Sequence, residues 1–162
     1  MLTAERLRDL LDCNPKTGSC RWKVTRGSAK AGFEAGQIRS DGYCRIFIDG
    51  KSYYRHRIIW FFVHDEWPSG DLDHIDNISG HDWISNLRPA TREQNLANMR
   101  RHAKNTSGFK GVSWHKGRRK WRAAISKKNK HSHIGFFDTP EAAHAAYVGA
   151  AQRLHGEFAR AE

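Results

Sequence analysis

Apolar residues recur at helical spacing near both ends of the chain. Leu7, Leu10 and Leu11 follow Thr3, a residue type that caps helices, and they predict a first helix ending near residue 14. Residues 139–156 begin with a Thr-Pro pair, place alanines on one face and end at a glycine. They predict a second amphipathic helix.

Between these helices the pattern changes to short alternating runs. Residues 43–49 alternate and pass through Asp49-Gly50 into residues 51–54, which predicts a hairpin with a two-residue turn. Residues 55–64 are too apolar for an exposed helix, and Pro68 and Gly70 stop the segment. We therefore expect residues 55–64 to be part of the core.

Polar loops separate the elements expected in the middle of the chain. Residues 71–75 predict a short strand, and residues 76–83 a polar loop. Thr91 and Gln94 have the spacing of a capping box and predict a helix to about His102. A short polar stretch after this helix then predicts a linker.

The last third of the chain predicts a small sheet before its helix. Residues 110–115, 120–126 and 131–136 alternate and predict three strands, with turns at 116–118 and 128–130. Val112, Ala123 and Ile125 have the parity of residues that pack on the helix, so their neighbours are expected to face outward.

Charge is distributed unevenly along the chain. Its 28 lysines and arginines exceed its 17 acidic residues, which gives a formal net charge of +11. No acidic residue occurs between Gln94 and Phe137, and the same stretch carries many of the cations. A field of one sign favours a polyanionic partner, and nucleic acid is the commonest such partner of a basic chain.

Several classes of protein are excluded or disfavoured. No apolar run approaches the roughly 20 residues that cross a bilayer, and the first residues lack the pattern of a signal peptide, so we expect a cytoplasmic protein with no membrane partner. Cys13, Cys20 and Cys44 are an odd number without a CxxC pair. They predict free, mostly buried side chains in a reducing compartment and no structural zinc.

Three neighbouring motifs carry the candidate chemistry. They are Asp73-His74-Ile75-Asp76-Asn77, Ser85-Asn86-Leu87-Arg88-Pro89 and Glu93-Gln94-Asn95. Their combined spacing resembles the HNH nuclease family over residues 72–98, and more loosely over residues 42–67. The resemblance implies a strand-loop-strand-helix metal finger that hydrolyses phosphodiester bonds.

Phosphodiester hydrolysis needs a base for water, a cation for the developing charge and a group that orients the base. His74 is the candidate base, because an imidazole is largely neutral near pH 7. The resemblance implies that Asp73 and Asn95 bind the metal and that Asn86 orients His74. Asp73 and His74 can serve one site only if the strand ends or bends there.

The residue at position 95 bears on which metal is bound. Many family members carry a histidine where this chain has Asn95. The resulting pair of oxygen donors favours Mg²⁺, with Mn²⁺ as an alternative, over tight binding of zinc.

The basic carboxy-terminal region has a resemblance of its own. The segments Gly108–His115, Lys120–Ile125 and Ile134–Ala143 closely resemble the Apetala-two DNA-binding domain, which implies a sheet lying in the major groove of DNA. The candidate DNA-binding residues are Lys110, Ser113, Trp114, His115, Arg118, Arg119, Trp121 and Arg122.

These patterns together predict an α+β protein. An HNH nuclease domain at residues 1–103 and a linker at 104–107 precede a DNA-binding domain at 108–162, a three-stranded antiparallel sheet packed on one helix. The expected function is that of a homing-type DNA endonuclease, encoded by a phage or prophage. The alternatives are a DNA-binding regulator or architectural protein with an inactive finger and, from a third class, an RNA-binding or ribosome-associated protein. The oligomeric state stays open.

Overall fold

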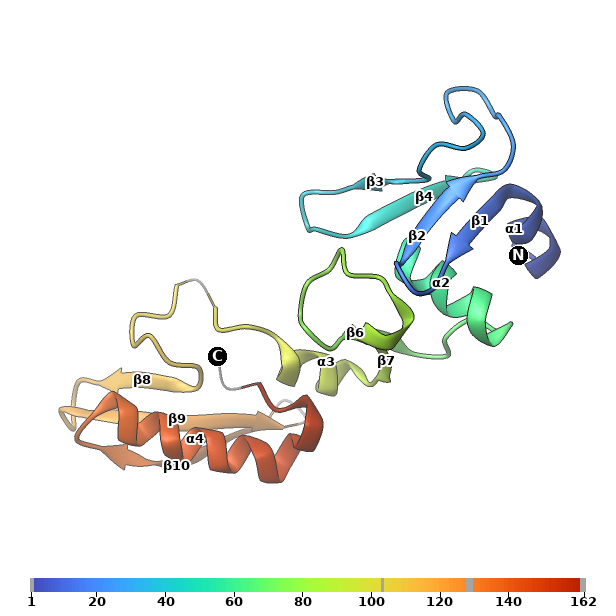
Figure 1. The fold of residues 1–162 in the computed structure, drawn as a ribbon. Helices are drawn as coiled ribbons and strands as arrows, with labels where there is room; N and C mark the ends of the chain where they lie inside the picture. The colour runs from blue at the N-terminus through green and yellow to red at the C-terminus, as the bar shows by residue number, and fades with distance from the viewer. Residues whose placement is uncertain (1, 103, 128–129, 161–162) are drawn as a thin grey trace. The chain divides into compact units, whose positions relative to one another are not determined.

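The computed structural model describes residues 2–102, 104–127 and 130–160 (Figure 1). The chain forms two compact units, Met1–Ala90 and Thr91–Glu162. The boundary between the units therefore lies before the predicted linker at 104–107, and the division into functional domains stays a prediction.

The first unit begins with a helix and a tight hairpin. Helix α1 (Ala4–Leu10) is capped by the Thr3 side chain, as predicted, and strands β1 (Leu11–Asn14) and β2 (Ser19–Trp22) pair in antiparallel fashion. The prediction that the helix continues to residue 14 is wrong. Leu11 instead pairs with Trp22 across the hairpin, and this pairing overrides the local helical pattern.

The hairpin corrects the expectation for two cysteines. Cys13 and Cys20 face each other in the register of β1 and β2 and form a disulfide, whereas Cys44 is free and buried. The sequence pattern did not show this bond, because it depends on the reversal of the chain between the two residues.

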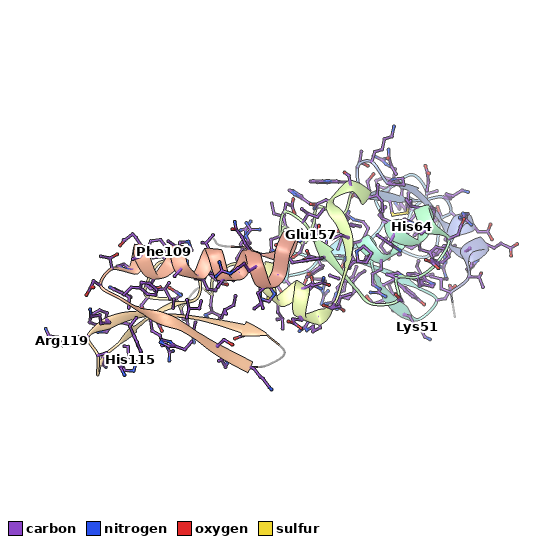
Figure 2. The ribbon with its side chains drawn as sticks, turned by 90° about the horizontal axis from the view of Figure 1, so that it is seen from below. Lys51, His64, Phe109, His115, Arg119 and Glu157 are labelled. Carbon is purple, nitrogen blue, oxygen red and sulfur yellow. A yellow bond between two sulfur atoms is a disulfide. The ribbon has the colours of Figure 1, made fainter. Side chains whose placement is uncertain are left out.

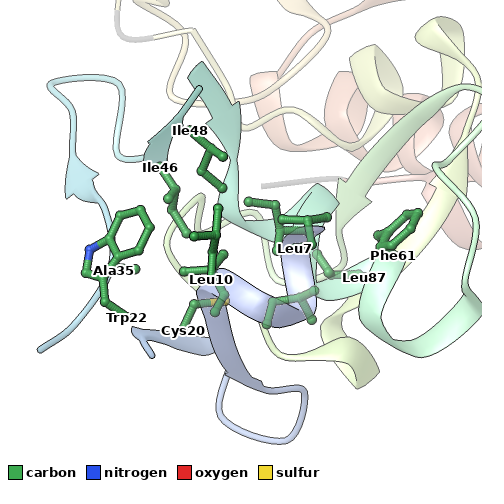
Figure 3. Packing of buried hydrophobic residues seen from close by; sticks show 12 residues of the cluster. Leu7, Leu10, Cys20, Trp22, Ala35, Ile46, Ile48, Phe61 and Leu87 are labelled. Atoms are coloured by element: carbon green, nitrogen blue, oxygen red, sulfur yellow. The ribbon is translucent and has the colours of Figure 1, made fainter. Parts of the chain in front are cut away.

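A three-stranded sheet and a helix complete the core of the first unit. Its order is β3 (Gln37–Ile38), β4 (Cys44–Ile48) and β5 (Lys51–Tyr54), and α2 (Arg55–His64) follows directly. The turn at Asp49-Gly50 has positive φ at both residues, as a hairpin of this length requires. Figure 3 shows the resulting core, in which Leu7 and Leu10 of α1 pack with Ile46 and Ile48 of β4.

The segment with the candidate motifs follows α2. Strands β6 (Asp71–His74) and β7 (Leu87–Ala90) pair in antiparallel fashion and enclose a loop that ends in the short 3-10 helix η1 (Ile84–Asn86). The chain then continues into α3 (Arg92–Asn98), which belongs to the second unit. The strand-loop-strand-helix order is thus present along the chain.

The second unit contains the predicted sheet and helix. Strands β8 (Val112–His115), β9 (Lys120–Lys127) and β10 (Lys130–Phe137) form an antiparallel sheet, and α4 (Pro140–His155) packs across one face before η2 (Gly156–Phe158) (Figure 1). Val112, Ala123 and Ile125 are buried, as expected. The turn predicted at 128–130 lies partly outside the described residues.

Caps explain where the two helices of this unit begin. Thr91 and Gln94 form the predicted capping box of α3, and the Thr139 side chain caps α4. Helix α3 ends at Asn98 rather than near His102, because Met99 takes up an extended conformation. Among the described residues, no helix combines the length and the apolar character that crossing a membrane requires.

Candidate active site

Strand β6 delivers Asp73 and His74 side by side at its end. Both are buried, with 4% and 5% of their surface exposed. The strand ends at His74, and the chain turns at once, since Asn77 donates from its backbone to the His74 carbonyl and has a φ of 62°. The end of the strand that the sequence analysis required is therefore present.

The imidazole of His74 is bound to a buried carboxylate. Its Nε2 lies 2.9 Å from Oδ1 of Asp82, a residue only 1% exposed. The other oxygen of Asp82 accepts a hydrogen bond of 2.8 Å from Nε of Arg55. A carboxylate that accepts from Nε2 selects the tautomer that carries its lone pair on Nδ1.

Arg55 is itself held at the first residue of α2. Its guanidinium also donates to Oε1 of Glu34 at 3.0 Å and to the Gly80 carbonyl at 3.2 Å. The arginine thus connects the three-stranded sheet region, the helix and the loop between β6 and β7. Its own side chain is 9% exposed, so the ion pair with Asp82 is shielded from water.

Asp73 has a cationic neighbour of its own. Arg88 lies opposite it in the register of β6 and β7 and donates to Oδ2 at 2.9 Å. A charged carboxylate in so buried a position needs such a partner. This arrangement gives the Asp73 carboxylate a charge partner within the strand pair.

Asn86 closes the loop between the two strands. Its side-chain oxygen accepts from the Asp76 amide at 3.1 Å, and its amide donates to the Asp76 carboxylate and the His81 carbonyl. The backbone carbonyl of Asn86 accepts from Ile75, the residue after His74. Asn86 is therefore positioned to act on His74 through the backbone; its role in orienting the base stays a prediction.

The loop also holds a second histidine and carboxylate pair. His81 Nδ1 lies 2.6 Å from Asp76. Burial acts to raise the pKa of Asp76, but the hydrogen bonds from Asn86, His81 and the Ile78 amide outweigh it, so this pKa lies below its ordinary value. The pair is partly exposed, and it fixes the shape of the loop.

A third imidazole packs against His74. The His56 ring stands edge-on to it, with centroids 5.1 Å apart, and burial together with the neighbouring His74 lowers the pKa of His56 to about 3. Within the described part of the chain, the ligand atoms of His56, His74 and Asp82 lie within 4.8 Å of one another. Two nitrogens and one oxygen would suit a borderline metal, yet Arg55 on the same carboxylate opposes a cation there.

The predicted metal ligands belong to different units. Asp73 lies in the first, and Asn95 lies in α3 of the second, where its backbone N–H donates to Thr91. Their sharing of one ion stays a prediction.

Three of the eight predicted DNA-binding residues, Ser113, His115 and Arg122, lie on one face of the sheet in the second unit. This outer sheet face consists of Ser113, His115, Lys120, Arg122 and Phe136, which are paired across the strands. Arg118 stacks over the Phe136 ring at 4.8 Å. Figure 2 shows His115 and Arg119 at the end of the sheet that carries the β8–β9 turn, whereas Phe109 lies beside α4.

Three of the predicted DNA-binding residues have other surroundings. Trp114 and Trp121 pair on the side of the sheet that faces α4, and Trp121 packs against Val112 and Ala123. The ammonium of Lys110 donates to the carbonyls of Ala97 and Met99 at 2.6 and 2.7 Å, at the end of α3. The roles of these three residues in DNA binding remain predictions.

Sequence reasoning did not single out Arg55, and it placed Asp82 only within the polar loop at residues 76–83. The two residues are separated by 27 positions, and no local pattern connects them. One signal was present. An arginine that opens an otherwise apolar, buried helix needs an acidic partner from elsewhere in the chain.

The region that contains the candidate site matches a known protein family. A family model described as HNH endonuclease matches residues 53–97. Protein 3.8 of Escherichia phage T7 is 37% identical over 112 residues, which are 68% of this chain and 91% of that protein. A solved structure titled DNA binding and cleavage by the HNH homing endonuclease I-HmuI is similar with a TM-score of 0.42 and 23% identity, covering 90% of this chain and 85% of the other.

Proposed function

This chain belongs to the family of Protein 3.8 of Escherichia phage T7 and carries an HNH endonuclease domain, and on that premise we propose that it is a metal-dependent endonuclease of double-stranded DNA. The observation that supports the proposal best is the buried pair of His74 and Asp82 beside Asp73 at the end of β6. This pair holds an imidazole in one orientation, as a general base requires.

The chemistry of the site follows from its side chains. His74, bound through Nε2 to Asp82, accepts a proton from water at Nδ1, and the resulting positive charge is balanced by the carboxylate. Asn86 keeps the loop closed around the site. Water deprotonated in this way attacks a phosphodiester phosphorus, the P–O bond to one sugar oxygen breaks, and that oxygen leaves and takes up a proton from solvent.

The donor atoms available fit a hard divalent cation. Asp73 is buried beside Arg88 and offers carboxylate oxygens, and Asn95 offers an amide oxygen, so this pair would bind Mg²⁺ or Mn²⁺. When bound, the ion supplies positive charge to the scissile phosphate and the leaving oxygen.

The second unit supplies the anchor on DNA in this proposal. The outer sheet face, with Arg118 and Arg119 at its end, presents exposed cations and an aromatic ring on one surface. Cations contact phosphates, and arginine can read guanine in the major groove. The phage origin of Protein 3.8 supports a phage- or prophage-encoded protein that acts on DNA in the host cytoplasm.

The test is plasmid cleavage. We expect the purified protein with Mg²⁺ to convert supercoiled plasmid to nicked or linear DNA, and EDTA to prevent it. His74→Ala should abolish cleavage while DNA affinity in a gel shift stays within about twofold, because the substitution removes the base and not the anchor.

Two results would contradict the assignment. Cleavage that persists in EDTA would exclude a metal-dependent reaction, and an active His74→Ala protein would exclude the base. A wild-type protein that binds DNA but never cuts it would instead be a DNA-binding regulator or architectural protein with an inactive finger.

A further inference from the structure

We propose that Asp82, held by Arg55, is a positioning residue that fixes the tautomer and orientation of His74. The inference rests on the proposed nuclease function and adds two residues to its site. Asp82 is the most buried of the polar and charged residues at the site, and each of its carboxylate oxygens has a defined partner: His74 on one side and Arg55 on the other.

Arg55 supplies the charge partner that a carboxylate without contact with water needs. A lone buried carboxylate costs several kcal/mol, which is why such groups are paired or protonated. The Nε–H group of Arg55 donates a hydrogen bond of 2.8 Å to Asp82, and Arg55 is itself only 7% exposed. Because the arginine neutralises the charge, Asp82 remains an acceptor for the imidazole N–H.

The backbone around Asp82 is held independently of its side chain. Gly18, in the turn between β1 and β2, lies so close that a Cβ there would meet the Asp82 carbonyl carbon at 2.4 Å. Two residues further on, the Ile84 amide donates to the Pro15 carbonyl at 2.8 Å. The backbone of Asp82 is therefore held by one hairpin, and one of its carboxylate oxygens is held by Arg55 of α2.

The contact with Asp82 fixes the orientation of the His74 imidazole and does not bind the substrate. With Asp82 as acceptor, His74 carries its proton on Nε2 and its lone pair on Nδ1. An asparagine at position 82 would fit the same space but could also donate to Nε2, which favours the opposite tautomer. The ring would then carry its proton on Nδ1, the nitrogen that must accept a proton from water, and its lone pair on Nε2.

The decisive variant is Asp82→Asn, compared with Asp65→Asn as a matched control. Asp65 is an exposed aspartate that caps α2 and pairs with Arg8, outside the candidate site. Imidazole ¹⁵N resonances recorded at a fixed pH near 8 distinguish the two tautomers, and the His74 signals are identified by their absence in His74→Gln. We expect Nε2–H in the wild type and in the control, and the Nδ1–H form or a mixture in Asp82→Asn.

Activity supplies the second measurement. We expect Asp82→Asn to lower kcat by about 100-fold or more with KM within about threefold, because the altered group orients the base and does not bind DNA. The control should keep wild-type values. If Asp82→Asn does not fold, the double variant Arg55→Gln/Asp82→Asn leaves no charge buried alone and is expected to show the same change of tautomer and kcat.

Three results would overturn the positioning role. One is an unchanged His74 tautomer in Asp82→Asn, and another is an unchanged kcat. The third is one equivalent of zinc in the purified protein that is absent from Asp82→Asn, which would make His56, His74 and Asp82 a metal site. The tautomer is read without any cleavage, so a protein that never cuts DNA would refute the proposed function and leave this measurement intact.

Discussion

His56 is the residue whose burial has the clearest consequence for stability. Its Nδ1 is buried without a hydrogen-bond partner among the described residues, and its pKa is lowered from 6.5 to about 3 by burial and by the nearby His74. Between these two values the unfolded chain binds a proton that the folded chain does not. The contribution is fully present above pH 6.5 and is lost as the pH falls toward 3.

We therefore expect the free energy of unfolding to fall below pH 6.5, with a contribution from His56 of at most about 1.4 kcal/mol per pH unit. His56→Phe keeps a ring in the same place and removes the titration. Urea unfolding of both proteins between pH 7 and pH 5 measures the difference. Parallel pH profiles for the two proteins would show that His56 is not buried as described.

At the residue scale, the sequence places the candidate site residues near one another along the chain but does not reveal their long-range partners. Asp73, His74 and Asn86 come from two neighbouring motifs, so their neighbourhood follows from local spacing. Arg55 and Asp82 meet only because α2 packs near the loop between β6 and β7, and Glu34 joins them from a third segment. Such long-range ion pairs leave no trace in periodicity.

Among the elements, we expect the hairpin of β1 and β2 to contribute more to stability than its short length suggests. Gly18 has a φ of 71°, and an added Cβ would lie 2.4 Å from the backbone of Asp82. We expect Gly18→Ala to lower the free energy of unfolding by about 2 kcal/mol or more, since backbone strain and a backbone clash combine. Thermal or urea unfolding measures this loss.

Gly27→Ala is the matched control for that substitution. Gly27 also has a positive φ, of 56°, but nothing lies within 4 Å of an added Cβ. Gly27→Ala should lower the free energy of unfolding by about 1 kcal/mol, from backbone strain alone. Equal losses in the two variants would mean that the hairpin turn does not pack against Asp82.

Element prediction succeeded where caps and turns are local. Thr3, Thr139 and the Thr91 capping box begin helices as expected, and Asp49-Gly50 makes the hairpin turn. It failed where strand pairing competes with helical spacing, as at Leu11. The helical spacing of the leucines contains no information about the pairing of Leu11 with a strand that begins eight residues later.

For the whole molecule, the uneven charge predicts how DNA binding responds to salt. Arg119 lies in the β8–β9 turn, and Arg122 lies on the outer sheet face opposite Ser113. We expect Arg119→Ala/Arg122→Ala to weaken binding and to flatten the dependence of log K on log salt by up to about two units, if both contact phosphate. Gel-shift titrations at several salt concentrations give this slope.

A pair of substitutions in the first unit separates contact from overall charge. Lys16→Ala/Lys51→Ala also removes two positive charges, but from exposed positions of the first unit. Its slope should stay close to that of the wild type. If both double variants flatten the slope equally, net charge alone would explain the effect, and the outer sheet face would lose its role as the anchor.

The Cys13–Cys20 disulfide joins the two strands that flank the turn packed against Asp82. Thiol reagents added during purification would leave that turn held by its backbone bonds and packing only. Samples handled with and without reductant are consequently two covalent species, and a comparison of their nicking rates would report how firmly the hairpin supports the imidazole.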